Sequence, residues 1–488
     1  MEQRGVASDE GPGIVVERRG AKLRRVYRGE IEETFLLGAA CSEVFTGPRL
    51  AKVLRPALEH QRLAIEKMER GESWEPLSIH TSAGFPGALT GFVECLEKNL
   101  PWTGSDWFVN VQQEGATAVW AGVEALGHLR QMAPHPKCSA SRSLDVCRVG
   151  VAERSYHGTP TTALGQPAKP LWPNAPRTTG QVSYPLPPLS GEKECEEYLR
   201  KFDAFLAEHP DIGIFVFEPQ WGSSRLARAW PPQLLKEVIA RCQRSGAYVL
   251  CDEVMCGLGE QPFGTVAGRH GEGTLFLSQA WALEPDAVTF GKSLASGTFP
   301  LSGVIVRHGS KAMWEAGIKI QQSHTYAGSS ALAYLTATEI LRELPGWFDR
   351  ANRSGQMVRD LLGPVADGKF FRLYGQGLLW GGEFAKTVAA TDLKAACHKE
   401  GVWPYIVESP SLGLMFLVRT VSVKVLPLFL PTLLRRSPRW ASTGWPWGRR
   451  FCFRISPPMD IDEDQLREGL EGLVRVVNRL KAGLPEEA

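Results

Sequence analysis

Apolar runs alternate with amphipathic segments through the middle of the chain. The runs IGIFVFEP (212–219) and AYVLCDEV (247–254) are nearly continuous, which predicts buried strands. Between them, PPQLLKEVIARCQRSG (231–246) has helical spacing and ends at a glycine. The same patterns predict further strands at 107–111, 147–153, 286–292 and 302–306, and helices at 50–70, 114–132 and within 185–210. Apolar strands separated by amphipathic helices predict an α/β protein with a mainly parallel sheet, covered by helices on both faces.

The pattern changes after about residue 331. Helices are predicted at 331–343, 391–400 and 462–482, with a strand at 378–384. We therefore expect three parts: an N-terminal segment (1–79) packed on the small domain, a large domain (80–330) and a smaller α+β C-terminal domain (331–488).

Charge is nearly balanced over the 488 residues, at +2, so the composition suggests no nucleic-acid partner. The segment at about 419–450 is an exception, with seven basic residues and no acidic one. It reads as a basic surface loop, a partner-binding segment or sequence outside the mature fold. Without it, the chain has 48 basic residues against 53 acidic ones.

The ten cysteines show neither C-x-x-C pairs nor metal-ligand spacing. They are typical of reduced thiols, so we expect a cytoplasmic protein. The chain has no apolar signal segment and no uninterrupted membrane span, so no membrane partner is expected.

Polar residues follow three of the predicted strands, namely Glu218, Asp252 and Lys292. In a parallel sheet these strand ends share one edge, where ligands bind. Lys292 follows the apolar run AVTF and precedes small residues (SLAS), which suits a nucleophilic or Schiff-base lysine. Taken alone, this stretch favours a strand-end lysine that reaches solvent.

The neighbouring groups suggest a cofactor. A buried Asp252 needs a positive partner, and a protonated pyridine nitrogen is one. The Lys292 amine could reach an aldehyde on the same ring, and Tyr156 and His157 follow another strand of the sheet. The helix that starts at 114–117 offers backbone N–H groups to a phosphate. Together these groups meet the requirements of pyridoxal 5'-phosphate.

Several stretches resemble the class III, or omega-type, pyridoxal-phosphate aminotransferases of fold type I. They are FEPQWG (217–222), LCDEVMCGLG (250–259), PDAVTFGKSLASGTFPLSGVIV (285–306), HTYAGSSALA (324–333) and FRISPPMDIDEDQL (453–466). The resemblance implies a seven-stranded large-domain sheet, with Lys292 as the Schiff-base lysine and Asp252 as the partner of the pyridine nitrogen. It also implies that Val254 and Tyr156 pack on the two faces of the ring.

The same resemblance implies that Gly115 and Ala116 bind the phosphate through their backbone. Thr325 would complete the cofactor site of a second subunit, which implies a homodimer. Arg454 resembles the arginine that takes a substrate carboxylate, a role that suits its planar fork. Two side chains keep alternatives open: Glu218 is a cofactor contact or an ion-pair or capping residue, and His157 is a cofactor contact or a structural histidine.

The chain departs from the family pattern at four places. Glu114 stands where relatives usually have serine, and GLGEQPFG (257–264) lacks the usual arginine. The span from Asp252 to Lys292 carries extra residues at about 266–280. Ser223 replaces a glutamate that can mask the carboxylate-binding arginine, which predicts that Arg454 stays available for an α-carboxylate.

The resemblance implies an aminotransferase that moves an amino group from an amino acid or amine donor to a keto acid or aldehyde acceptor. Two alternatives remain. The same fold supports a pyridoxal-phosphate decarboxylase, racemase or aminomutase, and a non-catalytic scaffold would explain the altered phosphate loop.

Overall fold

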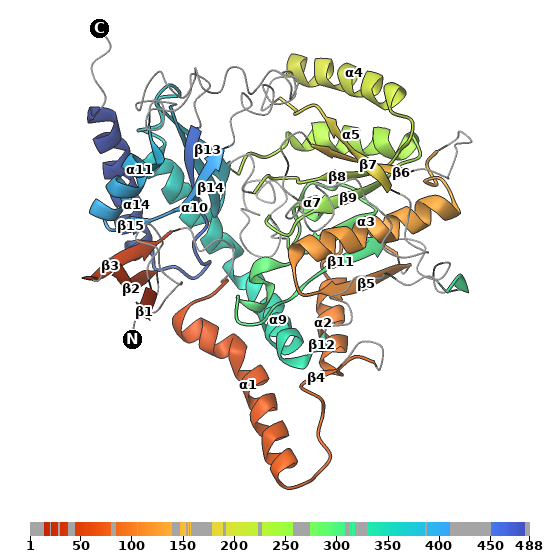
Figure 1. Cartoon of the computed structure of the whole chain (residues 1–488), viewed down its shortest axis with the longest axis horizontal. Helices are drawn as coiled ribbons and strands as arrows, with labels where there is room; N and C mark the ends of the chain where they lie inside the picture. The colour runs from red at the N-terminus through yellow and green to blue at the C-terminus, as the bar shows by residue number, and fades with distance from the viewer. Residues whose placement is uncertain are drawn as a thin grey trace, which may run out of the picture.

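The structure of the protein is a computed structural model (Figure 1). The first and last described elements, β1 (Ile14–Arg19) and α14 (Glu463–Ala482), lie on the same side of the molecule. The structure describes residues 14–19, 21–27, 30–37, 44–79, 84–104, 106–138, 147–152, 155, 157, 178–188, 192–222, 227–256, 274–307, 313, 315–317, 320, 329–385, 388–409 and 450–483.

A central sheet holds seven strands among the described residues. Their spatial order is β5 (Trp107–Gln112), β11 (Ser302–Arg307), β10 (Ala287–Phe290), β9 (Tyr248–Asp252), β8 (Ile212–Phe217), β6 (Cys147–Ala152) and β7 (Thr178–Tyr184). Neighbours from β10 to β7 are parallel, and β11 runs antiparallel to both β10 and β5. The predicted mainly parallel sheet is confirmed.

Helices cover both faces of this sheet, as predicted. α3 (Gly115–Met132) packs on one face against β11, β10, β5, β9 and β8, where Leu250 joins its apolar cluster. Val249 and Cys251 point the other way, into a cluster with α5 (Pro232–Arg244). The remaining helical elements of this part are α2 (Ala88–Glu97), α4 (Glu192–Glu208), α7 (Leu277–Ala280) and the 3₁₀ turn η2 (Lys292–Ala295).

The junction between α5 and β9 fixes where Asp252 falls. Pro232 lies in the first turn of α5, where proline is well tolerated. Gly246 follows the helix in a left-handed conformation (φ 91°) that glycine adopts without steric cost. The chain therefore turns directly into β9, whose last residue is Asp252.

A smaller antiparallel sheet lies beside the large one. Its order is β13 (Phe371–Gln376), β14 (Leu379–Phe384), β17 (Arg450–Ile455) and β16 (Tyr405–Ser409). One face is aromatic and packs on helices, with Phe371, Phe384 and Phe453 in a single cluster. The helical elements of this part are α9 (Ala331–Glu343), η4 (Leu344–Trp347), α10 (Phe348–Leu362), α11 (Ala390–Lys399) and α14.

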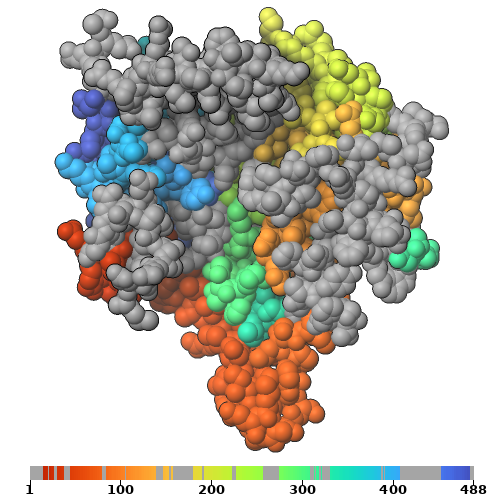
Figure 2. All heavy atoms as spheres, viewed as in Figure 1, coloured from red at the N-terminus to blue at the C-terminus, as the bar shows by residue number. Residues whose placement is uncertain are grey.

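The N-terminal part forms a further sheet and a projecting helix. β1, β2 (Lys22–Tyr27) and β3 (Glu30–Leu36) form a meander, and β3 pairs with β15 (Val402–Trp403). A two-stranded pair joins β4 (Ser78–Ile79) to β12 (Ser329–Ser330). α1 (Gly47–Glu69) extends away from the body of the molecule (Figure 2). In the described part of the chain, no helix combines the length and apolar character that crossing a bilayer requires.

Candidate functional site

Asp252 lies at the carboxyl end of β9 and is 6% exposed. Its carboxylate accepts hydrogen bonds from the Thr289 hydroxyl (3.1 Å) and the Val254 N–H (3.1 Å). A third contact joins it to Nδ1 of His157 at 2.7 Å. Thr289 lies directly opposite Asp252 on the parallel strand β10, so the sheet itself holds this hydroxyl in place. Three groups thus fix the orientation of one buried carboxylate.

His157 is buried behind Asp252, with a side chain 3% exposed. Burial alone would lower the pKa of His157, but the hydrogen bond to Asp252 and the charges of Asp252 and Glu218 raise it above its ordinary value of 6.5. Its Nε2 is buried and has no hydrogen-bond partner among the described residues. His157 therefore supports a negative Asp252.

Lys292 follows β10 and begins the turn η2. The strand ends at Phe290, two residues earlier than the predicted 286–292 strand. Lys292 adopts a left-handed conformation (φ 50°), which costs a non-glycine residue roughly 1–2 kcal/mol. Its side chain is exposed, as expected from this stretch taken alone for a strand-end lysine that reaches solvent. This backbone conformation ends the extended strand, and Lys292 leaves it at the same edge of the sheet as Asp252.

The start of α3 lies against the loop after Asp252. The first N–H groups of a helix have no partner within the helix, so Gly115 and Ala116 present donors here. A Cβ added to Gly115 would lie only 2.4 Å from Cγ1 of Val254, and one added to Gly291 would lie 3.4 Å from it. Val254 therefore packs between the helix start and the segment that leads to Lys292. Glu114 caps no backbone group with its side chain, which is exposed.

Glu218 follows β8, which is parallel to and paired with β9. It is buried, and one carboxylate oxygen accepts the Gly222 N–H at 3.1 Å. This hydrogen bond ties Glu218 to the loop after β8, and the charge of Glu218 also acts on His157.

Arg454 comes from the small antiparallel sheet. It lies on β17, is 2% exposed, and its guanidinium stands over the Tyr405 ring at 4.5 Å. In the sheet register it lies opposite Gly381 and Tyr405. Leu379, which shares this face of the sheet, packs with Met255 from the loop after β9. The face that carries Arg454 thus turns toward the loops at the edge of the large sheet.

Some predicted features lie outside the described residues. Tyr156, Thr325 and Ser223 belong to this group, as do the stretch 257–273 and nearly all of the basic segment at 419–450. The structure therefore brings together His157, Asp252, Val254, Gly115 and the approach to Lys292, while the roles of Tyr156 and Thr325 stay predictions. No cluster of histidine, cysteine or carboxylate groups suited to a metal is present in the part of the chain that is described.

Sequence reasoning missed several residues at this edge. Thr289 reads as an ordinary β-branched strand residue, and only the pairing of β9 with β10 reveals its contact. Glu253 is fully buried, and its oxygens accept the N–H groups of Leu277 (2.6 Å) and Ser278 (2.9 Å). Burial raises the pKa of Glu253 to about 7. The sequence signal for Glu253 was a second carboxylate directly after Asp252, at the end of an apolar strand.

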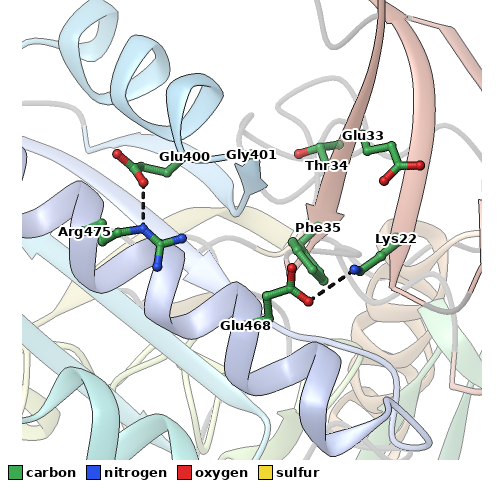
Figure 3. Close-up of a pocket in the computed structure, with 8 residues that line it drawn as sticks. All are labelled: Lys22, Glu33, Thr34, Phe35, Glu400, Gly401, Glu468 and Arg475. Atoms are coloured by element: carbon green, nitrogen blue, oxygen red, sulfur yellow. Dashed lines mark hydrogen bonds and ion pairs between the residues drawn. The ribbon is translucent and has the colours of Figure 1, made fainter.

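A separate cavity of about 220 Å³ opens elsewhere, between the N-terminal strands and α14 (Figure 3). Its lining contains the ion pairs Lys22–Glu468 (3.2 Å) and Glu400–Arg475 (2.8 Å). None of the lining residues belongs to the large sheet. These pairs join β2 and the end of α11 to the C-terminal helix α14.

The groups at the strand edge fit pyridoxal phosphate. A carboxylate backed by His157 and Thr289 suits a protonated ring nitrogen, and the exposed Lys292 amine suits an aldehyde. The helix start at Gly115 suits a phosphate. Glycine is required there, because a side chain would displace Val254.

Solved structures share this fold. An ornithine delta-aminotransferase of Plasmodium falciparum superposes with a TM-score of 0.64 at 18% identity, covering 98% of this chain and 96% of that chain. An (S)-enantioselective omega-transaminase of Thermomicrobium roseum superposes with a TM-score of 0.67 at 16% identity, covering 98% and 96%. The fold is thus that of the fold type I pyridoxal-phosphate transferases.

Sequence comparison identifies the family within this fold. The profile of the aminotransferase class-III family matches residues 93–420, which is 328 of the chain's 488 residues. The 4-aminobutyrate aminotransferase GabT of Escherichia coli is 32% identical over 222 residues, covering 44% of this chain and 48% of that protein. Such alignments span about half the length of the curated relatives. The chain belongs to the class III aminotransferase family, whose cofactor is pyridoxal phosphate.

Proposed function

We propose that the protein is a pyridoxal-phosphate-dependent aminotransferase, which moves an amino group from an amino acid or amine to a keto acid or aldehyde. One observation supports this most strongly. Asp252 and Lys292 follow neighbouring parallel strands, and Asp252 is buried and backed by His157 and Thr289. A scaffold protein would have no use for an oriented, buried carboxylate at the sheet edge to which a strained lysine also leads.

Bound at this edge, the cofactor would supply an aldehyde for linkage to amines and a ring that takes up electrons from a breaking Cα–H bond. Asp252 would keep the ring nitrogen protonated, with His157 holding its charge in place. Gly115 and Ala116 would bind the phosphate through N–H groups, and Val254 and Tyr156 would pack on the ring. Lys292 would hold the cofactor and, once displaced by a donor, move the proton at the substrate Cα.

Arg454 would bind the substrate carboxylate. A guanidinium offers two parallel N–H donors, which suit a carboxylate and orient the substrate. The ring of Tyr405 supports the guanidinium from one side. Because Ser223 replaces the glutamate that masks this arginine in relatives, Arg454 would remain available for α-carboxylates.

We also propose a homodimer in which Thr325 completes the partner's cofactor site. Support comes from α1, which projects from the body and exposes Leu58 (52%) and Ile65 (43%) on one face of the helix. Trp74, beyond the end of the helix, is 41% exposed. Apolar side chains on a projecting arm are typical of an interface. A second copy of the chain would cover them.

The reaction would take place in the cytoplasm. The nine cysteines among the described residues are all free thiols, as expected in a reducing compartment.

The chain would divide into an N-terminal segment (1–79), a large domain (80–330) and a C-terminal small domain (331–488). Partners would be small donors and acceptors, without nucleic acid or membrane.

The test is the visible absorption spectrum of the purified protein supplied with pyridoxal phosphate. We expect a band from the lysine-bound cofactor that bleaches with an amino donor and returns with a keto acid. Lys292→Ala should abolish the band and slow the exchange by about 10²–10⁴-fold or more. Lys98→Ala, a change at an exposed lysine after α2, should leave both unchanged.

Each other outcome points to a different function. Failure to take up the cofactor in excess would favour the scaffold. A band that forms but never bleaches, together with carbon dioxide release or deuterium exchange at Cα without an acceptor, would favour a decarboxylase or racemase.

A further inference from the structure

Arg228 belongs to the connection after β8, here called the arm, of which residues 218–222 and 227–230 are described. The arm follows β8 and is held by backbone bonds from Trp221 N–H to the Arg228 carbonyl (2.8 Å) and from Ala227 N–H to the Gly222 carbonyl (3.3 Å). The Gln220 amide donates to the Ala227 carbonyl (2.8 Å) and to the Leu379 carbonyl of β14 (3.3 Å). The arm is therefore fixed to both sheets.

The backbone beside Arg228 is strained. Ala227 is fully buried in a left-handed conformation (φ 60°), which a residue with a Cβ rarely adopts. Such strain persists only where the surroundings enforce it, and it is concentrated at functional sites. Here it turns Arg228 toward the small sheet.

The guanidinium of Arg228 meets two residues of that sheet. Its Nη2 donates to the Glu383 carboxylate at 3.2 Å, and the group lies 3.9 Å from the centre of the Tyr374 ring. The side chain is only 18% exposed, and its Nε is buried without a partner among the described residues. A guanidinium carries five N–H donors, so this one can accept a further anion.

Glu383 and Arg454 lie on the same face of the small sheet. Tyr374, Gly381, Arg454 and Tyr405 form one cross-strand row, and Glu383 is two residues beyond Gly381 on β14. Diagonal positions of this kind are roughly 7–8 Å apart. Gly381, which lies next to both Arg454 and Glu383 on this face, carries no side chain.

We propose that Arg228 is a second anion-binding residue of the substrate pocket, receiving a carboxylate at the far end of a substrate whose other carboxylate is held by Arg454. When the substrate has no distal acid, Glu383 serves as the counter-charge of Arg228. When the substrate has one, Glu383 releases one or more of the Arg228 N–H donors, which then bind the substrate carboxylate. The Tyr374 ring holds the Arg228 guanidinium in the same place whether or not a distal carboxylate is bound. This inference rests on the proposed aminotransferase function and names the specificity of that site.

Two keto acids of equal length test the proposal: 2-oxoglutarate, which has a distal carboxylate, and 2-oxopentanoate, which lacks it. The measured quantity is the ratio of their kcat/KM values as acceptors. Arg228→Met should lower this ratio by about 10- to 100-fold, the loss expected for a charge-assisted hydrogen bond. Glu383→Gln should raise it, because Arg228 then lacks its internal partner.

Arg372→Met is the matched control, since Arg372 also approaches Glu383 (3.9 Å) but its side chain is 42% exposed. It should leave the ratio within about twofold. Should Arg228→Met fail to fold, Arg228→Lys replaces it and should lower the ratio as well, because an ammonium cannot offer the planar fork. An unchanged ratio in folded Arg228 variants that still use 2-oxopentanoate would overturn the proposal.

A binding measurement separates this inference from the proposed function. In calorimetry without substrates, glutarate should bind the wild-type protein more tightly than pentanoate, and Arg228→Met should remove the difference. If no keto acid is turned over, aminotransferase activity is refuted while this readout still tests Arg228. Equal binding of both acids by the wild type would count against Arg228 as an anion site.

Discussion

At the scale of single residues, His157 and Asp252 form a buried pair whose charge depends on pH. The pKa of His157 is raised in the folded protein above the ordinary 6.5. The stabilisation from the charged histidine is therefore complete below about pH 6.5 and is lost as pH rises through the folded pKa.

The first prediction concerns His157→Asn. We expect the variant to be less stable than the wild type by about 1–3 kcal/mol near pH 5.5, the cost of losing a buried charged partner. The difference should shrink as pH rises above 6.5. Urea unfolding of the cofactor-free proteins at pH 5.5, 6.5, 7.5 and 8.5 measures it.

His398→Asn supplies the control. His398 pairs with Glu32 at 3.0 Å, but its side chain is 45% exposed, so its removal should cost less than about 1 kcal/mol. A His157 effect that is equal at every pH would refute the charged-pair interpretation.

Asp252 and Lys292 were identifiable from sequence because each is a lone charge beside an apolar strand. Arg228 and Glu383 were not, because they lie 155 residues apart and meet only when the two sheets come together. Glu383 offered the same signal as Asp252, a single carboxylate in the apolar strand LWGGEF. No pattern in the sequence indicated that Arg228 would be the partner of Glu383.

At the scale of elements, the start of α3 depends on the close approach of Gly115 to the Val254 side chain. The Cβ that Gly115→Ala introduces would lie 2.4 Å from Val254, so the helix start or the loop after β9 must shift.

We therefore predict that Gly115→Ala lowers the free energy of unfolding by about 1–3 kcal/mol, the usual cost of overpacking. It should also weaken binding of pyridoxal phosphate, measured by fluorescence titration, by about tenfold. Gly91→Ala in α2 is the control, since nothing lies within 4 Å of its added Cβ. That change should be neutral or stabilise by up to about 1 kcal/mol. Equal behaviour of the two variants would contradict the packing argument.

Apolar periodicity predicted six of the seven described strands of the large sheet, because buried strands and amphipathic helices carry strong patterns, but not the edge strand β7, whose sequence is TTGQVSY. It missed β1, β2 and β3, whose sequences IVVERR, KLRRVY and EIEETFL are rich in charge. There, cross-strand ion pairs such as Arg25–Glu32 replace a buried apolar face. Long-range pairing, not local pattern, determines such strands.

At the scale of the whole molecule, α1 projects from the body and exposes apolar side chains. Leu58 and Ile65 are seven residues apart and so lie on one face of the helix, with Lys67 about 180° around from Leu58.

The double variant Leu58→Glu, Ile65→Glu should convert a dimer into monomers, because charges would replace apolar contacts at both copies of the interface. Light scattering on a sizing column should give about twice 53.7 kDa for the wild type and about 53.7 kDa for the variant. Lys67→Glu, on the opposite face, should remain dimeric. A monomeric wild type would refute the homodimer, and a dimeric double variant would move the interface away from α1.

The order of the large sheet also has a consequence for synthesis on the ribosome. Among the strands that the structure describes, β5 lies at the edge of the sheet and pairs only with β11, which begins 195 residues later. At 5–20 residues per second, roughly 10–40 s pass before that partner is translated. During this interval the nascent chain carries an open strand edge and an uncovered apolar face of α3. An unpaired strand edge and exposed apolar surface can pair with other chains, which is the hazard that chaperones counter during synthesis.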